Sequence, residues 1–162
     1  MSGYRISLQV NGRVVEVAAE PNEFLSDVLR DKLGLTGTKI ACNEGVCGSC
    51  TVLLDGKPIY SCLKLACDVG DQEILTVEGL AQGEKLHPVQ QAFLDVGSSQ
   101  CGFCTTGFIM TTKALLDNIP DPKIDEVKQA LSGNICRCTD YAGYVEAVLR
   151  AAQLARKATE RA

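Results

Sequence analysis

Residues 42–50 read CNEGVCGSC, and a further cysteine stands at position 62. The four thiols follow the spacing C-x4-C-x2-C with a remote fourth member, and they are Cys42, Cys47, Cys50 and Cys62. This spacing is typical of a plant-type 2Fe-2S site. Structural zinc sites are more often built from pairs of short C-x2-4-C turns, so a zinc site is a possible alternative that fits this spacing less well. Gly45 and Gly48 favour iron and sulfide, because three thiolates on one side of a cluster need a tight loop with positive φ.

A second group of cysteines occupies the other half of the chain. It consists of two short pairs, Cys101 with Cys104 and Cys136 with Cys138. Four thiolates in two pairs fit either a second 2Fe-2S site or a single zinc ion, and spacing alone does not separate these. The ninth cysteine, Cys67, is left over, and we expect it to be a small buried hydrophobe rather than a ligand or redox group.

Composition excludes several classes of protein. The chain has 162 residues, with 16 Lys+Arg against 20 Asp+Glu and a formal charge of −4, and it carries no run of basic residues. Nucleic acid is therefore not an expected partner. No window approaches the ~20 apolar residues that cross a bilayer, and the N-terminus lacks the apolar region of a signal peptide. We expect a cytoplasmic protein with no membrane span, whose clustered thiols bind metal rather than form disulfides.

The first half of the chain has the pattern of a small β-sheet crossed by one helix. The dipeptides Asn11-Gly12 and Asp55-Gly56 are strong hairpin signals. Apolar positions on one face predict a helix over residues 22–33, which Gly34 is placed to end. Apolar runs and alternation predict the strands, which cover residues 4–10, 14–17, 51–54, 59–62 and 74–77.

After Glu78 the period of the apolar residues becomes helical. Four amphipathic helices are expected, over residues 88–96, 105–117, 124–132 and 141–157, and they predict a bundle. Pro88 suits the first position of the first helix, and we expect His87 to cap it or contact the surface rather than bind metal. One cysteine pair precedes the second helix and the other precedes the fourth, so both pairs can meet at one end of the bundle.

Three motifs carry a resemblance to a known family. They read CNEGVCGSCTV at 42–52, QCGFC at 100–104 and GNICRCT at 133–139. In order and spacing they resemble the small iron-sulfur subunit of the molybdenum hydroxylases, the family of xanthine dehydrogenase, aldehyde oxidoreductase, carbon monoxide dehydrogenase and 4-hydroxybenzoyl-CoA reductase. The resemblance implies an α+β fold, with a β-grasp plant-type ferredoxin domain over residues 1–78 and a four-helix bundle over residues 79–162. It also implies that the second group of cysteines holds 2Fe-2S.

The same resemblance implies partners and a role. A large subunit would hold molybdopterin, usually with an appended cytosine nucleotide, and a medium subunit would usually hold FAD. The second cluster would lie nearest the pterin, with Gln100 and Cys138 in contact with it, and the plant-type cluster would face the flavin. Electrons would pass between molybdenum and flavin through the two clusters, and this chain would bind no substrate itself.

Two other functions are compatible with the same residues. A free-standing two-cluster electron carrier or redox sensor would use the same eight thiols, and a zinc-binding interaction module would use them without iron. The chain also departs from the family pattern in three places that are not ligands. Asn43 stands where Gly is frequent, Thr106 where Pro is usual and Asp140 where Gly is common.

Overall fold

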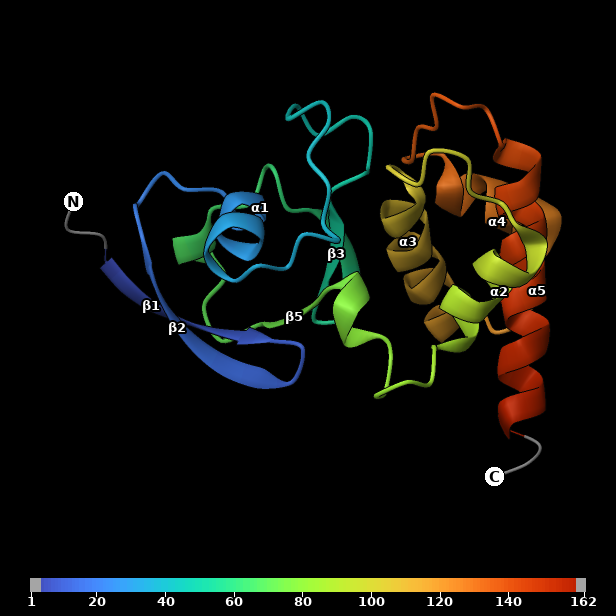
Figure 1. Cartoon of the computed structure of the whole chain (residues 1–162), viewed down its shortest axis with the longest axis horizontal. Coiled ribbons are helices and arrows are strands. Elements are labelled where there is room, and N and C mark those ends of the chain that lie inside the picture. The colour runs from blue at the N-terminus through green and yellow to red at the C-terminus, as the bar shows by residue number, and fades with distance from the viewer. Residues whose placement is uncertain (1–3, 160–162) are drawn as a thin grey trace.

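The computed structural model describes residues 4–159 and contains a five-stranded sheet beside a group of four helices (Figure 1). The strands are β1 (Tyr4–Val10), β2 (Arg13–Ala19), β3 (Thr51–Leu54), β4 (Lys57–Tyr60) and β5 (Glu73–Leu75). Their order in the sheet is β2-β1-β5-β3-β4, in which β1 and β5 are parallel and the other neighbours antiparallel. This mixed sheet, with a helix packed on it, confirms the expected α+β fold with a β-grasp ferredoxin domain.

The two hairpins turn where the sequence predicts. Asn11 and Gly12 have φ of 52° and 73°, and Asp55 and Gly56 have φ of 49° and 76°. Two successive residues with positive φ form the two-residue turn whose twist matches that of the flanking strands.

Three strands differ from their predicted bounds: β2 is longer than the predicted 14–17, and β4 and β5 each begin and end earlier than predicted. The strand expected over 59–62 is β4 and ends at Tyr60, so Cys62 follows the strand instead of lying within it. The strand expected over 74–77 is β5 and ends at Leu75, and η3 (Val77–Gly79) is a short 3-10 helix. The amide side chain of Asn11 explains this end, because its Oδ1 accepts the Thr76 N–H at 2.9 Å and takes the place of a neighbouring strand.

The helix expected over 22–33 is shorter and changes its winding. α1 (Leu25–Asp27) continues directly into η1 (Val28–Lys32), a π-helical turn in which the Leu33 N–H bonds to the Val28 carbonyl at 3.0 Å. It begins late because Phe24 is extended and forms a β-bridge with Leu65. Gly34 ends the helix with φ of 71°, as predicted.

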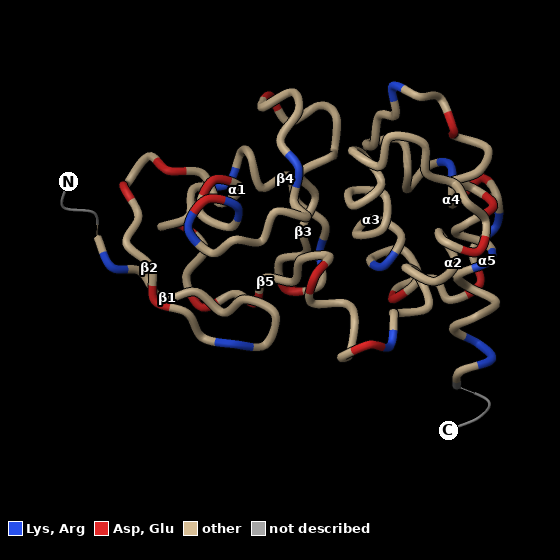
Figure 2. Tube along the Cα trace, in the orientation of Figure 1, with Lys and Arg blue, Asp and Glu red and all other residues tan. Residues whose placement is uncertain are grey.

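The remaining helices begin and end within about two residues of the predicted positions. They are α2 (Pro88–Val96), α3 (Thr105–Asn118), α4 (Ile124–Leu131) and α5 (Tyr141–Thr159). His87 caps α2, since its Nδ1 accepts the Val89 N–H at 3.2 Å. None of the helices within residues 4–159 combines the length and the apolar character that a bilayer crossing requires. Acidic and basic residues are interspersed along both the sheet and the helices (Figure 2).

Two hydrophobic clusters meet at β3. Val52 and Leu54 belong to the cluster between the sheet and α1, whereas Leu53 belongs to the cluster formed mainly by the helices. All four residues of β3 are buried, so this strand is covered on both faces, and α3 packs against it. The close approach of α3 depends on Gly107, because a Cβ there would collide with the carbonyl oxygen of Gly48.

We therefore predict that Gly107→Ala lowers the free energy of unfolding by about 1–3 kcal/mol, the usual cost of overpacking against atoms that cannot move aside. Gly143→Ala is the matched control, since it also lies within a helix but its Cβ would meet only the carboxylate of Asp140, at 2.7 Å. Helix propensity predicts little loss or a gain of up to ~1 kcal/mol for the control. Thermal unfolding of the two variants measures the difference, and equal midpoints would contradict the packing argument.

Candidate metal centres

The loop from Cys42 to Cys50 curls tightly around its own first thiol. Asn43, Gly45 and Gly48 all have left-handed φ, of 54°, 70° and 71°. Asn tolerates this conformation better than most residues other than Gly, which explains how Asn43 can occupy this turn. The curled backbone directs the N–H groups of Glu44 and Cys47 at Cys42 Sγ, each at 3.4 Å. These bonds favour the thiolate and lower the pKa of Cys42 to about 6.

Two other thiols of the first group are buried together. Cys50 immediately precedes β3 and Cys62 follows β4, and their Sγ atoms lie 3.4 Å apart. Burial disfavours the charged form and raises the pKa of Cys50 to about 12. The side chains of Cys42 and Cys47 also interact with one another. The first group is thus brought together as two pairs, Cys42 with Cys47 and Cys50 with Cys62.

The second group forms two pairs as well. Cys104 and Cys136 interact with one another in the buried part of the site, and Cys101 and Cys138 interact nearer the surface. Gly102 and Thr139 have left-handed φ of 80° and 66° and turn the two loops that carry these cysteines. Burial raises the pKa of Cys104 to about 11.

The paired arrangement fits the donor chemistry of 2Fe-2S clusters. Each such cluster contains two irons and takes four thiolates, two on each iron. No group of three or more His, Cys, Asp and Glu side chains within residues 4–159 is arranged to hold a single metal ion. What the structure brings together is pairs of thiols, in each of the two groups.

Gln100 lies beside the second group, as expected. Its Nε2 donates to the carbonyl oxygen of Cys138 at 3.1 Å, and both the Gln100 side chain and the adjoining Cys101 are exposed. The two residues to which the family resemblance assigns a pterin contact are therefore hydrogen-bonded neighbours.

The two cysteine loops lie on the same side of the molecule, at the top of Figure 1, and are hydrogen-bonded to one another. The N–H of Ile135, next to Cys136, donates to the carbonyl oxygen of Cys47 at 2.9 Å. The buried Asn134 donates to Gly48 O at 3.0 Å and accepts from Thr111 Oγ1 at 2.8 Å. Asn134 lies within the GNICRCT motif, but the sequence alone assigns it no role, because the motif does not indicate a partner 86 positions away.

Tyr144 is a second residue that the sequence did not mark. It lies on α5 and is 1% exposed, with its hydroxyl 3.3 Å from Cys104 Sγ and 3.2 Å from Thr105 Oγ1. Burial raises the pKa of Tyr144, so its hydroxyl keeps its proton. In the sequence, nothing distinguishes Tyr144 from the apolar positions of the predicted helix.

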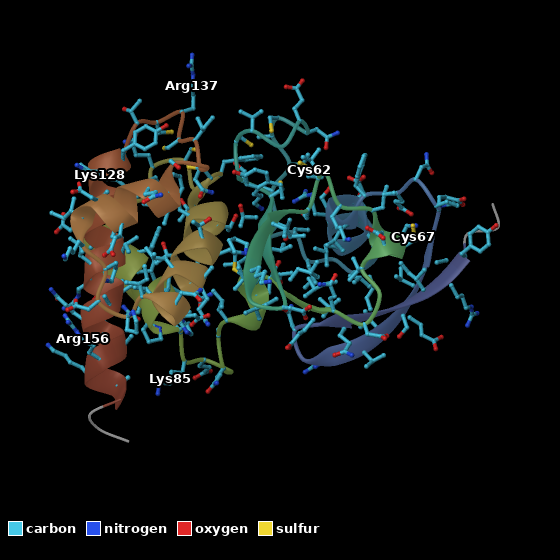
Figure 3. The ribbon with its side chains drawn as sticks, turned by 180° about the vertical axis from the view of Figure 1, so that it is seen from behind. Cys62, Cys67, Lys85, Lys128, Arg137 and Arg156 are labelled. Carbon is cyan, nitrogen blue, oxygen red and sulfur yellow. The ribbon has the colours of Figure 1, made fainter. Side chains whose placement is uncertain are left out.

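The expectation that Cys67 is buried was wrong. Cys67 is exposed and its thiol bonds to the carbonyl oxygen of Pro21 at 3.3 Å, whereas the adjacent Ala66 is 1% exposed. Both lie in η2 (Ala66–Asp68), a 3-10 turn that rotates successive side chains by about 120° and so faces only one of them to the core. Figure 3 shows Cys67 well apart from Cys62, so it joins neither group.

Models of known protein families match both halves of the chain. One, described as a 2Fe-2S iron-sulfur cluster binding domain, matches residues 8–85. The other, described as a 2Fe-2S binding domain, matches residues 76–149. Fold and cysteine loops together define a protein with two 2Fe-2S-binding domains in one chain.

Comparison with known relatives identifies a family within this class of two-cluster proteins. The chain is 48% identical over 153 residues to the 6-hydroxypseudooxynicotine dehydrogenase complex subunit beta of Paenarthrobacter nicotinovorans, covering 93% of this chain and 95% of that one. It is 47% identical over 141 residues to the nicotinate dehydrogenase small FeS subunit of Eubacterium barkeri, covering 87% and 90%. It matches the structure of quinoline 2-oxidoreductase from Pseudomonas putida 86 with a TM-score of 0.92 and 46% identity, covering 97% and 98%. The chain belongs to the small iron-sulfur subunits of the molybdenum hydroxylases.

The contact between the two cysteine loops generates a prediction. Asn134→Ala removes the partner of the buried Thr111 hydroxyl and should cost about 1–3 kcal/mol of stability. Because it also frees the Gly48 loop, the amide hydrogen of Ile135 should exchange faster with solvent. Asn118→Ala is the control, since Asn118 bonds only to Ala114 O within its own helix at 2.8 Å. Hydrogen exchange followed by mass spectrometry measures this, and unchanged exchange at Ile135 in Asn134→Ala would refute the proposed coupling.

Proposed function

We propose that this chain relays electrons between a molybdopterin centre and FAD, both held by partner subunits of a multisubunit molybdenum oxidoreductase. The observation that carries the proposal is the direct bond between the two cysteine loops, from the Ile135 N–H to the carbonyl oxygen of Cys47. When bound, 2Fe-2S clusters supply one-electron redox centres. The chain's own residues hold the two centres next to one another and tie their loops together.

The proposed ligands are the eight paired thiols. The first centre takes Cys42, Cys47, Cys50 and Cys62, and the second takes Cys101, Cys104, Cys136 and Cys138. The proposed division between the domains falls after residue 78, which is supported by the two hydrophobic clusters that share β3. Residues 1–3 and 160–162, at the outer ends of these domains, lie outside the described residues.

Exposed apolar side chains support a partner on each cysteine loop. Val46 and Leu63 beside the first group are each 55% exposed, and Phe103 and Ile135 beside the second are 44% and 45% exposed. Clustered apolar side chains at a surface mark sites of protein contact. We assign the second loop, with Gln100 and Cys138, to the subunit that holds molybdopterin, in its cytosine dinucleotide form. We assign the first loop to the FAD subunit.

The names of the relatives support a multisubunit assembly, and the free thiols support a cytoplasmic location. Two of the relatives are named as a subunit of a dehydrogenase complex and as a small FeS subunit of a dehydrogenase. In this chain all nine cysteines are free thiols. Thiols persist in reducing compartments, so we propose that the complex is cytoplasmic.

The ligand assignment predicts two independent signals. On reduction, the loaded chain should show two electron paramagnetic resonance (EPR) signals. Cys47→Ser should abolish only the signal of the first centre and Cys136→Ser only that of the second, because each removes one of four thiolates from a single site. Cys67→Ser is the matched control and should keep both signals. Loss of both signals from either single ligand change would contradict separate sites.

The assembly is tested by purification of the complex from its native source. A large polypeptide that contains molybdenum and a pterin should co-elute with this chain, together with a flavoprotein. A monomer that carries both clusters and exchanges electrons with its own soluble partner would instead favour a free-standing carrier or redox sensor. Zinc without iron or acid-labile sulfide would refute the iron-sulfur assignment and favour an interaction module.

A further inference from the structure

The hydroxyl of Tyr144 lies between the thiols of one pair in the second group. It is 3.3 Å from Cys104 Sγ and 4.0 Å from Cys136 Sγ. Its ring is stacked on Phe108, with centroids 4.0 Å apart and planes 13° from parallel, and Phe93 packs against it at 5.8 Å. The position of the hydroxyl is therefore set by packing of the ring and does not depend on the hydrogen bond itself.

The direction of the bond to Cys104 follows from the chemistry of the ligand. A thiolate that binds iron has lost its proton, so Cys104 Sγ can then only accept and the Tyr144 O–H must donate. Two further hydroxyls extend the contact outward. Thr105 Oγ1 is 3.2 Å from the Tyr144 oxygen, and the exposed Ser99 Oγ is 3.1 Å from Thr105 Oγ1. Hydrogen bonds in such a chain polarise one another and strengthen the donor at its end.

We propose that Tyr144 is a positioning residue that donates a hydrogen bond to Cys104 Sγ and thereby raises the reduction potential of the second 2Fe-2S centre relative to the first. The inference rests on the proposed ligand set. Reduction adds negative charge to the cluster and its sulfur ligands, and a donor held against one of these sulfurs stabilises the reduced state more than the oxidised state. The effect is local, because the thiols beside the hydroxyl, Cys104 and Cys136, both belong to the second group.

Tyr141 provides a matched comparison on the same helix. Its hydroxyl accepts the backbone N–H of Cys136 at 3.0 Å, and the residue is 45% exposed. It therefore serves as an acceptor for the backbone, a role that water can take over, while Tyr144 serves as a donor to sulfur. Removing each hydroxyl with a Tyr→Phe change keeps both rings and separates the two roles.

The test is a redox titration of the full-length, cluster-loaded chain followed by EPR, for the wild type, Tyr144→Phe and Tyr141→Phe. Tyr144→Phe should lower the midpoint potential of the second signal. At a fixed solution potential, the ratio of reduced to oxidised second centre should fall about tenfold. For one electron this corresponds to a drop of about 59 mV in the midpoint potential. The first signal should not move, and Tyr141→Phe should move neither.

A second measurement detects the hydrogen bond itself. Electron-nuclear double resonance after exchange into D2O should show a strongly coupled exchangeable proton at the second centre of the wild type that is missing in Tyr144→Phe. Thr105→Val, which keeps the tyrosine and shortens the hydroxyl chain, should shift the second midpoint in the same direction but less. If Tyr144→Phe does not take up its clusters, the midpoint potential of the second centre is measured in Thr105→Val instead.

Three results would overturn the inference: no shift in Tyr144→Phe, equal shifts of both signals, or the same shift in Tyr141→Phe. A wild type that lacks the second signal altogether would refute the ligand set instead, so the two failures are distinguishable.

Discussion

The carbonyl oxygen of Gly48 accepts three hydrogen bonds, from the Thr51 N–H at 3.2 Å, from Thr51 Oγ1 at 2.7 Å and from Asn134 Nδ2 at 3.0 Å. The first two close the cysteine loop onto β3, and the third attaches the helical half of the chain. Gly107 of α3 passes directly over the same carbonyl. Because a side chain at either glycine would separate these surfaces, the spacing between the two proposed centres is set here.

Backbone N–H groups approach thiols in both groups, but the two proposed centres differ in where their hydroxyl comes from. In the first, Ser49 of the cysteine loop itself places its Oγ 3.7 Å from Cys47 Sγ. In the second, a side-chain hydroxyl from a distant helix approaches Cys104 Sγ. Backbone N–H donors are present whatever side chains the loop carries. The Tyr144 donor, in contrast, is lost when the single hydroxyl oxygen is removed. The potential of the second centre is therefore the easier of the two for sequence change to alter.

Much of the fold was predictable because it depends on short-range constraints. Asn-Gly and Asp-Gly turns need only two residues with positive φ, and each helix follows from apolar spacing and the residues at its ends. The prediction failed where a distant group intervened. β5 stops at Leu75 because Asn11 supplies its amide, and α1 begins late because Phe24 pairs with Leu65. Cys67 was misplaced because a single 3-10 turn reverses which neighbour is buried.

Sequence by itself determined the order of the two halves, the eight candidate thiols and the two glycines that curl the first loop, since cysteine spacing and glycine positions are local properties of the chain. Only the tertiary structure decided how the thiols pair, how the two loops meet and which hydroxyl faces the second centre. Those contacts join residues 40 positions apart in Tyr144 and Cys104 and 86 apart in Asn134 and Gly48. No periodicity or motif specifies such pairs, because they arise from packing α3 against β3 and α5 against α3.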